Sequence, residues 1–214
     1  MSENEKIKIT WHGHSCFAIE YDGYTIVTDP YTGVPGYPPL HVEADEVFCS
    51  HDHADHNFVS AVKKKNSGKK SPFKITEIGC FHDDKKGALR GKCVMRIFEA
   101  GGIRVAHLAD IGEMPDKDTV EKLKGLDCAL IPVGGFYTVD GKQAYKIIEA
   151  IDPVVAVPMH YRKGSCGYRE ISGPDDFLSC AVDRPVIKTG STFEIGGNSR
   201  CIIVPEVKGM ANEF

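Results

Sequence analysis

A short string of histidines and aspartates is the segment of this sequence whose residue types and spacing suit metal chemistry. It reads His51-Asp52-His53-Ala54-Asp55-His56. In an extended segment, side chains two positions apart project to the same side, so His51 and His53 can reach one cation. Asp55 and His56 follow where we expect the chain to turn into a helix, and they can face a second cation nearby. Imidazole and carboxylate ligands suit zinc, and also manganese or iron. The alternative is a histidine-rich polar surface turn.

Three further residues with suitable side chains each follow an expected strand. They are His82 after a strand ending at Ile78, Asp110 after Ile103–Leu108, and His160 after Val154–Val157. A lone histidine is more often structural than a ligand. Here the strands would bring all three side chains to one edge of the sheets, which is where the ligands of catalytic sites commonly gather in α/β folds. The sequence therefore predicts a metal site larger than the string alone can build.

The elements that must position these residues change in character along the chain. The first half reads as strands separated by turn residues, over 7–11, 16–21, 24–28, 46–49, 93–100 and 103–108, with one helix expected over Asn57–Lys65. From Asp116 on, helices (116–124, 142–150, 174–180) alternate with buried strands (128–133, 154–157), and two strands (192–195, 201–204) close the chain. This pattern predicts one α/β domain over residues 1–214, with two sheets inside and helices outside.

Composition narrows the classes of function. The chain has 214 residues, 42% of them hydrophobic and 26% charged, which is ordinary for a globular protein. Its formal net charge of -4 does not suggest a nucleic-acid binder. We expect a cytoplasmic protein, because no apolar run is long enough to cross a membrane and no apolar leader is evident. The eight cysteines are scattered, and we expect reduced thiols.

Together these motifs resemble those of metallo-β-lactamase-fold hydrolases, specifically the branch similar to L-ascorbate-6-phosphate lactonase. The resemblance spans nearly the whole chain and rests on Gly13-His14-Ser15, Asp29-Pro30, the His51–His56 string, His82, Ala109-Asp110 and Pro158-Met159-His160-Tyr161. It implies an αββα four-layer sandwich with a two-metal site. It also implies ligand roles: His51, His53 and His82 for one metal, Asp55, His56 and His160 for the other, Asp110 bridging both, and Asp29 holding the histidine loop from behind.

One position departs from the family pattern. The family usually has glycine before the bridging aspartate, and this chain has Ala109. If the backbone there needs a positive φ angle, alanine strains it and weakens the second metal site.

The chemistry that we expect from such a site is hydrolysis of an ester, lactone or phosphodiester in a small anionic substrate. Two adjacent cations lower the pKa of a bridging water, so that hydroxide exists at neutral pH. Candidates for the donor of the leaving-group proton are His14, His107 and Tyr161, chosen for their proximity to the motifs. Asp55 within the string is a further candidate catalytic residue. Each could equally be structural, since general acid catalysis depends on geometry.

Two basic segments and two loops bear on specificity. Lys63, Lys64, Lys65, Lys69 and Lys70 could clamp a phosphate-bearing substrate or RNA, but we favour a solvated helix C-terminus, because no aromatic residue interleaves them. Arg162 and Lys163 are better placed for an anionic substrate. We expect the loops Tyr31–Leu40 and Lys163–Gly173 to set specificity.

Three rival functions remain at this stage. A nuclease on the same fold usually carries an extra substrate-gripping domain, for which this chain has little length. A flavodiiron oxidoreductase has glutamate where this chain has His53, and it appends a flavin domain. The third is a non-catalytic protein, either a metal sensor or a degenerate binding module. A degenerate site should have lost ligands, and all seven are accounted for. The sequence leaves a homo-oligomer open.

Overall fold

Five strands form the first of two large sheets in the computed structural model, which describes residues 6–65 and 67–210. The strands are β1 (Ile7–Gly13), β2 (Cys16–Tyr21), β3 (Tyr24–Thr28), β5 (Glu46–Phe48) and β13 (Thr192–Ile195), in the order β13-β1-β2-β3-β5. All neighbours are antiparallel except β3 and β5. Asp22 and Gly23 turn between β2 and β3 with φ angles of 48° and 71°. That geometry belongs to the tight hairpin turn that Asp-Gly favours.

Seven strands form the second sheet, mainly from the later part of the chain. They are β7 (Lys74–Phe81), β8 (Lys92–Ala100), β9 (Ile103–His107), β10 (Cys128–Pro132), β11 (Val155–Met159), β12 (Val186–Thr189) and β14 (Cys201–Pro205), in the order β12-β14-β11-β10-β9-β8-β7. Strands β9 to β12 and β14 run parallel, and β7 to β9 are antiparallel. Every residue of β10 and β11 is buried, as expected for parallel strands covered on both faces.

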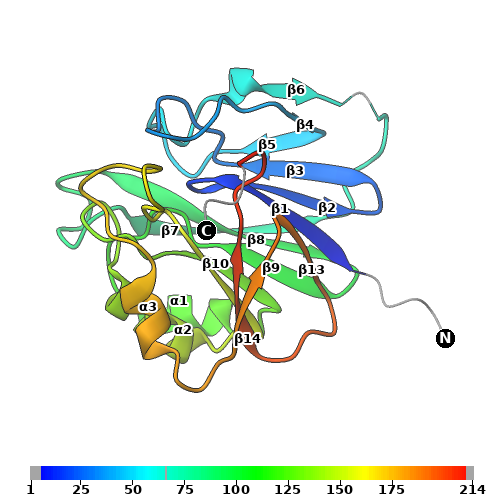
Figure 1. Cartoon of the computed structure of the whole chain (residues 1–214). Helices are drawn as coiled ribbons and strands as arrows, with labels where there is room; N and C mark the ends of the chain where they lie inside the picture. The colour runs from blue at the N-terminus through cyan, green and yellow to red at the C-terminus, as the bar shows by residue number, and fades with distance from the viewer. Residues whose placement is uncertain (1–5, 66, 211–214) are drawn as a thin grey trace.

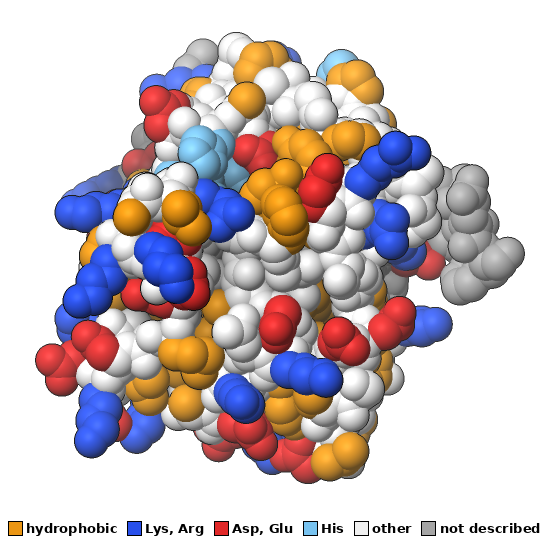
Figure 2. All heavy atoms as spheres, turned by 90° about the vertical axis from the view of Figure 1, so that its left-hand side faces the viewer, with side chains coloured by type: hydrophobic (Ala, Val, Ile, Leu, Met, Phe, Trp, Pro, Cys, Tyr) orange, Lys and Arg blue, Asp and Glu red, His pale blue; other side chains and the backbone are white. Residues whose placement is uncertain are grey.

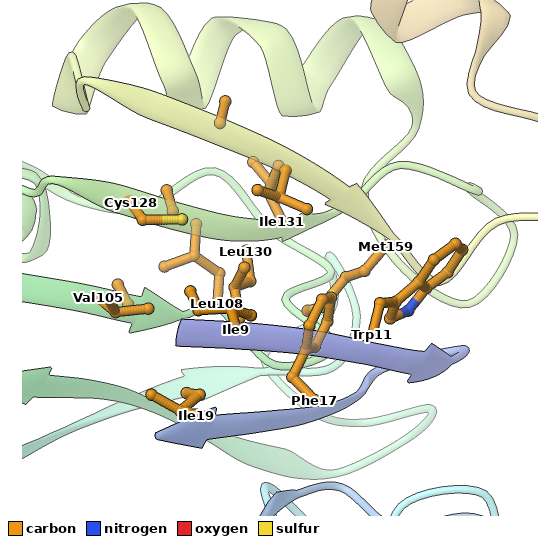
Figure 3. Close-up of a cluster of buried hydrophobic side chains, with 14 of the residues drawn as sticks. Ile9, Trp11, Phe17, Ile19, Val105, Leu108, Cys128, Leu130, Ile131 and Met159 are labelled. Carbon is orange, nitrogen blue, oxygen red and sulfur yellow. The ribbon is translucent and has the colours of Figure 1, made fainter. Parts of the chain in front are cut away.

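The core lies between the two sheets. Trp11 and Phe17 from the first sheet face Leu130 and Met159 from the second, and all four side chains are fully buried (Figure 3). Large apolar side chains supply most of the favourable free energy of such packing. This interface fixes one sheet against the other, and therefore fixes the relative positions of the loops that follow their strands.

Three helices alternate with the later strands of the second sheet. They are α1 (Lys117–Leu123), α2 (Gly141–Ile151) and α3 (Asp175–Cys180), and they lie on its outer side (Figure 1). Asp140 caps α2 by accepting a hydrogen bond from the Gln143 backbone N–H, while the Gln143 side chain accepts one from the Asp140 N–H. The apolar face of α2 is buried. The predicted packing of two sheets in layers is confirmed, with helices outside the second sheet (Figure 1).

The helix predicted over Asn57–Lys65 is wrong. The structure has a short 3-10 helix, η1 (Val59–Ala61), and a strand, β6 (Val62–Lys64), which pairs with β4 (Val42–Ala44). These two strands occupy the outer side of the first sheet, opposite to α1–α3 (Figure 1). Because this helix is absent, the lysines that begin at Lys63 do not lie at a helix C-terminus. Lys63 instead forms an ion pair with Glu43 at 2.6 Å.

No helix within the described part of the chain is long and apolar enough to cross a membrane. All eight cysteines are free thiols in the structure. Cys80 and Cys93 face each other across β7 and β8, with their sulfur atoms 3.0 Å apart.

Candidate metal centre

The predicted ligands meet where strands from both sheets end. His14 follows β1, the 51–56 string follows β5, His82 follows β7, Asp110 lies three residues beyond β9, and His160 follows β11. The loops that carry them converge on the left-hand side of the molecule in Figure 1. The expected gathering at one edge of the sheets is therefore present in the structure. Strand β7 runs on to Phe81, past the predicted end at Ile78, so that His82 comes directly after it.

The first group of ligand atoms comes from His51, His53 and His82, which each offer one atom within 4.8 Å of the others. The ring centroids of His51 and His53 are 4.5 Å apart, and those of His51 and His82 are 4.7 Å apart. Three imidazoles at this spacing can share one divalent cation. The set is the one that the family resemblance implies for the first metal.

The second group contains one more residue than expected. His14, Asp55, His56 and His160 each offer an atom within 4.8 Å of the others. His14 Nε2 lies 3.2 Å from Asp55 Oδ2, and the His14 ring is 4.0 Å from the His160 ring. From the sequence we expected His14 to be a candidate proton donor. Its position among the ligands makes it an additional candidate for holding the second cation.

Asp110 lies between the two groups. Its Oδ2 atom is 3.0 Å from His56 Nε2, 3.1 Å from His160 Nε2 and 3.5 Å from His82 Nε2. One carboxylate oxygen is therefore close to nitrogens of both groups. This is the placement that a bridging ligand requires.

Asp29 anchors the loop of residues 51–56 through hydrogen bonds on the side away from the ligand cluster. The Ser50 backbone N–H donates to Asp29 Oδ1 at 2.6 Å, and the Ser50 hydroxyl donates to Asp29 Oδ2 at 2.7 Å. Asp29 Oδ2 also lies 2.9 Å from His56 Nδ1, and Ser50 Oγ lies 2.9 Å from His51 Nδ1. These contacts hold the Nδ1 side of both rings and leave the two Nε2 atoms for the cluster.

Burial and the neighbouring carboxylates set the charge states of the histidines in this cluster. Burial lowers the pKa of His56, but the Asp110 and Asp29 carboxylates outweigh this effect and raise it well above its usual value. At His14 and His51 burial outweighs the nearby carboxylates and lowers the pKa values to about 3 and about 4. These imidazoles are therefore neutral at pH 7, as metal ligands must be.

The donor set fits divalent metal ions on a second ground. Several of its polar atoms are buried and have no hydrogen-bond partner among the described residues: Nε2 of His51 and His56, Nδ1 of His14, His82 and His160, and Oδ1 of Asp110. Buried polar atoms without partners are costly, and their accumulation at one place indicates a missing partner. Nitrogen and oxygen donors in this mixture suit zinc, manganese or iron.

Backbone strain concentrates at the same place. Within the described chain, eight residues other than glycine have a positive φ angle, and four of them are His14 (52°), Asp29 (43°), Ala109 (52°) and His160 (51°). Each such residue costs about 1–2 kcal/mol, and strain of this kind tends to collect at functional sites. The condition stated for Ala109 is met, because its φ angle is positive. The weakening of the second metal site stays a prediction.

Two of the three proposed proton donors have other roles in the structure. His107 Nδ1 accepts a hydrogen bond from the Ala109 N–H, and His107 Nε2 lies 2.9 Å from the Ser15 carbonyl oxygen, so both ring nitrogens are engaged by backbone. The Tyr161 ring packs on Trp11 with centroids 5.5 Å apart, and its side chain is buried. These contacts favour a structural role for both.

Tyr168 is a site residue that the sequence analysis did not single out. Its hydroxyl lies near enough to Asp55 to feel the carboxylate charge, and its ring centroid is 5.8 Å from that of His14. Burial and the Asp55 charge raise the pKa of Tyr168 to about 12, so the hydroxyl keeps its proton at neutral pH. No local pattern marks this tyrosine in the sequence.

The two loops expected to set specificity touch each other beside the site. The Gly167 N–H donates to the Pro35 carbonyl at 2.9 Å, and the Cys166 thiol donates to the Gly36 carbonyl. A side chain at Gly36 would collide with the Ser165 backbone, which explains the glycine. Arg162 and Lys163, the cations expected to meet an anionic substrate, are exposed.

Comparison with known proteins adds the family. Residues 8–160 match the family model of the beta-lactamase superfamily domain. The chain belongs to the metallo-β-lactamase superfamily. It is a metal-dependent hydrolase of the UPF0173 family within it, similar to a UPF0173 metal-dependent hydrolase of Archaeoglobus fulgidus (26% identical, covering 88% of this chain and 99% of that protein). A UPF0173 protein of Pyrococcus furiosus is 31% identical over 72% of this chain and 83% of its own length.

Solved structures of the metallo-β-lactamase superfamily share the fold. A Thermotoga maritima protein described as a Zn-dependent hydrolase of this superfamily superimposes with a TM-score of 0.71, at 31% identity, over 93% of this chain and 98% of its own. A metallo hydrolase from Ignicoccus hospitalis superimposes with a TM-score of 0.64 at 22% identity, over 82% of this chain and 90% of its own.

Proposed function

We propose that this metallo-β-lactamase-superfamily hydrolase uses two divalent cations to cleave an ester, lactone or phosphodiester bond in a small anionic substrate. The position of Asp110 carries the proposal. Its Oδ2 atom lies within 3.5 Å of ring nitrogens from both ligand groups. A carboxylate that serves two cations brings them close enough to act on one substrate.

The ligand assignment that we propose follows the two groups. His51, His53 and His82 hold the first cation, Asp55, His56 and His160 hold the second, and Asp110 serves both. His14 is a further ligand candidate at the second cation. Zinc is the preferred metal, with manganese or iron as alternatives, because the donors are imidazole nitrogen and carboxylate oxygen.

The chemistry divides between the cations and the chain. When bound, the two cations would activate a water and polarise the oxygen of the scissile bond. Asp29 and Ser50 orient His56 and His51 through their Nδ1 atoms. Tyr168 keeps its proton beside Asp55, and in our proposal the Tyr168 hydroxyl replaces His107 and Tyr161 as the source of the leaving-group proton.

Metal content and substrate class can be tested together. We would load the protein with zinc or manganese, measure bound metal by elemental analysis, and compare hydrolysis of a sugar-phosphate lactone with that of a chromogenic phosphodiester. Lactone turnover alone supports a lactonase related in activity to the ascorbate-6-phosphate branch. Phosphodiester turnover alone directs the search to nucleotides and RNA. Bound metal without turnover of either contradicts the proposed reactions and favours a metal-binding role.

A further inference from the structure

Aromatic side chains continue outward from the second ligand group. The Tyr168 ring lies 5.8 Å from His14 on one side and 5.8 Å from Tyr137 on the other. The Tyr137 ring in turn contacts Phe136, with centroids 4.8 Å apart. We call Phe136, Tyr137 and Tyr168 the aromatic wall. On the face of the molecule that carries the site, hydrophobic and basic side chains lie next to histidines (Figure 2).

Arg90 packs against the outer end of this wall. Its guanidinium carbon lies 5.5 Å from the Tyr137 ring centroid and 5.8 Å from that of Phe136. The side chain is half-buried, and no carboxylate oxygen of residues 6–65 or 67–210 lies within 4.0 Å of the guanidinium nitrogens. Stacking on rings fixes the plane of a guanidinium and leaves its N–H groups free at the edge. Arg90 is therefore an oriented cation without an anionic partner in the described chain.

The loop that carries Arg90 is built rigidly onto the metal centre. The buried Asp83 carboxylate accepts hydrogen bonds from four backbone N–H groups, those of Lys85, Gly87, Leu89 and Arg90, at 2.7–3.0 Å. The His82 N–H donates to the carbonyl of Gly91, the residue after Arg90. The position of Arg90 is thus tied to His82, a proposed ligand of the first cation.

Phe136 contributes little to the fold. Its side chain is 61% exposed, so it adds little to the core. Its φ angle is 60°, a conformation that is unfavourable for a residue with a bulky side chain. Strain of this kind tends to collect at functional sites, and here the ring lies 5.8 Å from the Arg90 guanidinium carbon.

We propose that Arg90 binds an oxyanion of the substrate, a carboxylate or a phosphate, at a point remote from the bond that is cleaved. The aromatic wall holds the guanidinium and contacts the apolar or planar part of the substrate between the two ends. This proposal rests on the proposed function, because the other end of the substrate is the one bound at the cations. It replaces Arg162 and Lys163 as the anchor for the anionic substrate.

Binding of rigid aromatic carboxylates to the zinc-loaded protein tests this directly by calorimetry. Benzoate offers one carboxylate for the cations. Isophthalate and terephthalate each offer a second carboxylate for Arg90, at a different distance from the first. We expect at least one dicarboxylate to bind about 10- to 100-fold more tightly than benzoate, as for a new charge-assisted pair. In Arg90→Gln this gain should disappear while benzoate binding stays unchanged.

Two further variants separate anchoring from general charge and from folding. Lys86→Gln removes an exposed charge from the same loop and should keep the gain. Phe136→Gly should lower the gain while the melting temperature is maintained or raised, because glycine relieves the strained φ angle. A gain that is absent for both dicarboxylates, that survives Arg90→Gln, or that falls equally in Lys86→Gln overturns the proposal. If zinc does not bind, the proposed function fails too. If zinc and benzoate bind but the dicarboxylate gain is absent, only the Arg90 proposal fails, so the two failures are distinguishable.

Discussion

The carboxylate of Asp29 lies 2.9 Å from Nδ1 of His56, and both side chains are fully buried. A carboxylate at this position accepts the Nδ1 proton, so that Nε2 is the ring nitrogen left to bind a metal once its own proton is displaced. Nε2 of His56 faces the ligand cluster, 3.0 Å from Asp110 Oδ2. The readiness of His56 to bind a metal therefore depends on a residue that lies outside the cluster.

Asp29→Asn should weaken metal binding while the fold persists. The amide has nearly the same shape, but its NH2 group can donate to His56 Nδ1, which favours the tautomer with a proton on Nε2. We expect metal affinity to fall by about 10- to 100-fold, as is typical when such an outer carboxylate is replaced. Titration with zinc in the presence of a competing chelator measures the change.

Asp45→Asn is the matched control for this variant. Asp45 is also a buried carboxylate, in the bend between β4 and β5, and it accepts hydrogen bonds from the Thr25 N–H and the Ser67 hydroxyl. It touches no ligand, so its substitution should change stability but leave metal affinity alone. Equal affinity of Asp29→Asn and the unchanged protein would refute the tautomer argument.

Much of the metal centre was predictable because its residues follow local rules. The sequence alone shows the spacing of His51 and His53. It also shows that His82, Asp110 and His160 come after expected strands. Strand ends in an α/β fold meet at one edge, so these local signals lead to a three-dimensional site.

The failures have physical causes of two kinds. Asn57–Lys65 has helical composition near its end, but Val62 and its neighbours gain a partner in β4, and this pairing overrides local propensity. Arg90, Tyr137 and Tyr168 come from three separate loops, and nothing in the sequence signals that the fold brings them together. Such a wall is a property of tertiary structure.

His51→Ala should abolish hydrolysis and lower bound metal while the protein stays folded. The side chain is a proposed ligand of the first cation, and its Nε2 atom has no hydrogen-bond partner in the described structure, so the fold loses little with it. Elemental analysis, circular dichroism and a hydrolysis assay on the same preparation give the three readouts. Full activity in this variant would rule out the ligand assignment.

His12 should make the metal-free protein sensitive to acid. Burial, with the nearby Lys208 cation, lowers the pKa of His12 to about 4. The unfolded chain, with an ordinary histidine pKa near 6.5, binds the proton more readily. The stability that His12 contributes as a neutral group is therefore present above about pH 6.5 and is lost as the pH falls toward 4, by roughly 2–3 kcal/mol.

His12→Ala isolates this effect. Urea unfolding at about pH 7.5 and about pH 4.5 should show a smaller loss of stability between the two values in the variant than in the unchanged protein. Comparing the differences removes the cost of the cavity, which is the same at both pH values. Hydrolytic activity should be nearly unchanged, because His12 belongs to neither ligand group. An identical pH dependence in both proteins would show that His12 does not carry the acid sensitivity.

Ala109→Gly should stabilise the protein, unlike most substitutions of a fully buried residue. Ala109 has a φ angle of 52°, which costs about 1–2 kcal/mol for a residue with a Cβ atom. Glycine removes this cost but gives the unfolded chain more freedom, so the expected net gain is about 0.5–1 kcal/mol. Ala106→Gly is the control: Ala106 is equally buried in β9 but has no positive φ angle, and its substitution should destabilise the protein. Chemical denaturation of both variants decides the point, and a loss of stability in Ala109→Gly would mean that the backbone before Asp110 is not strained.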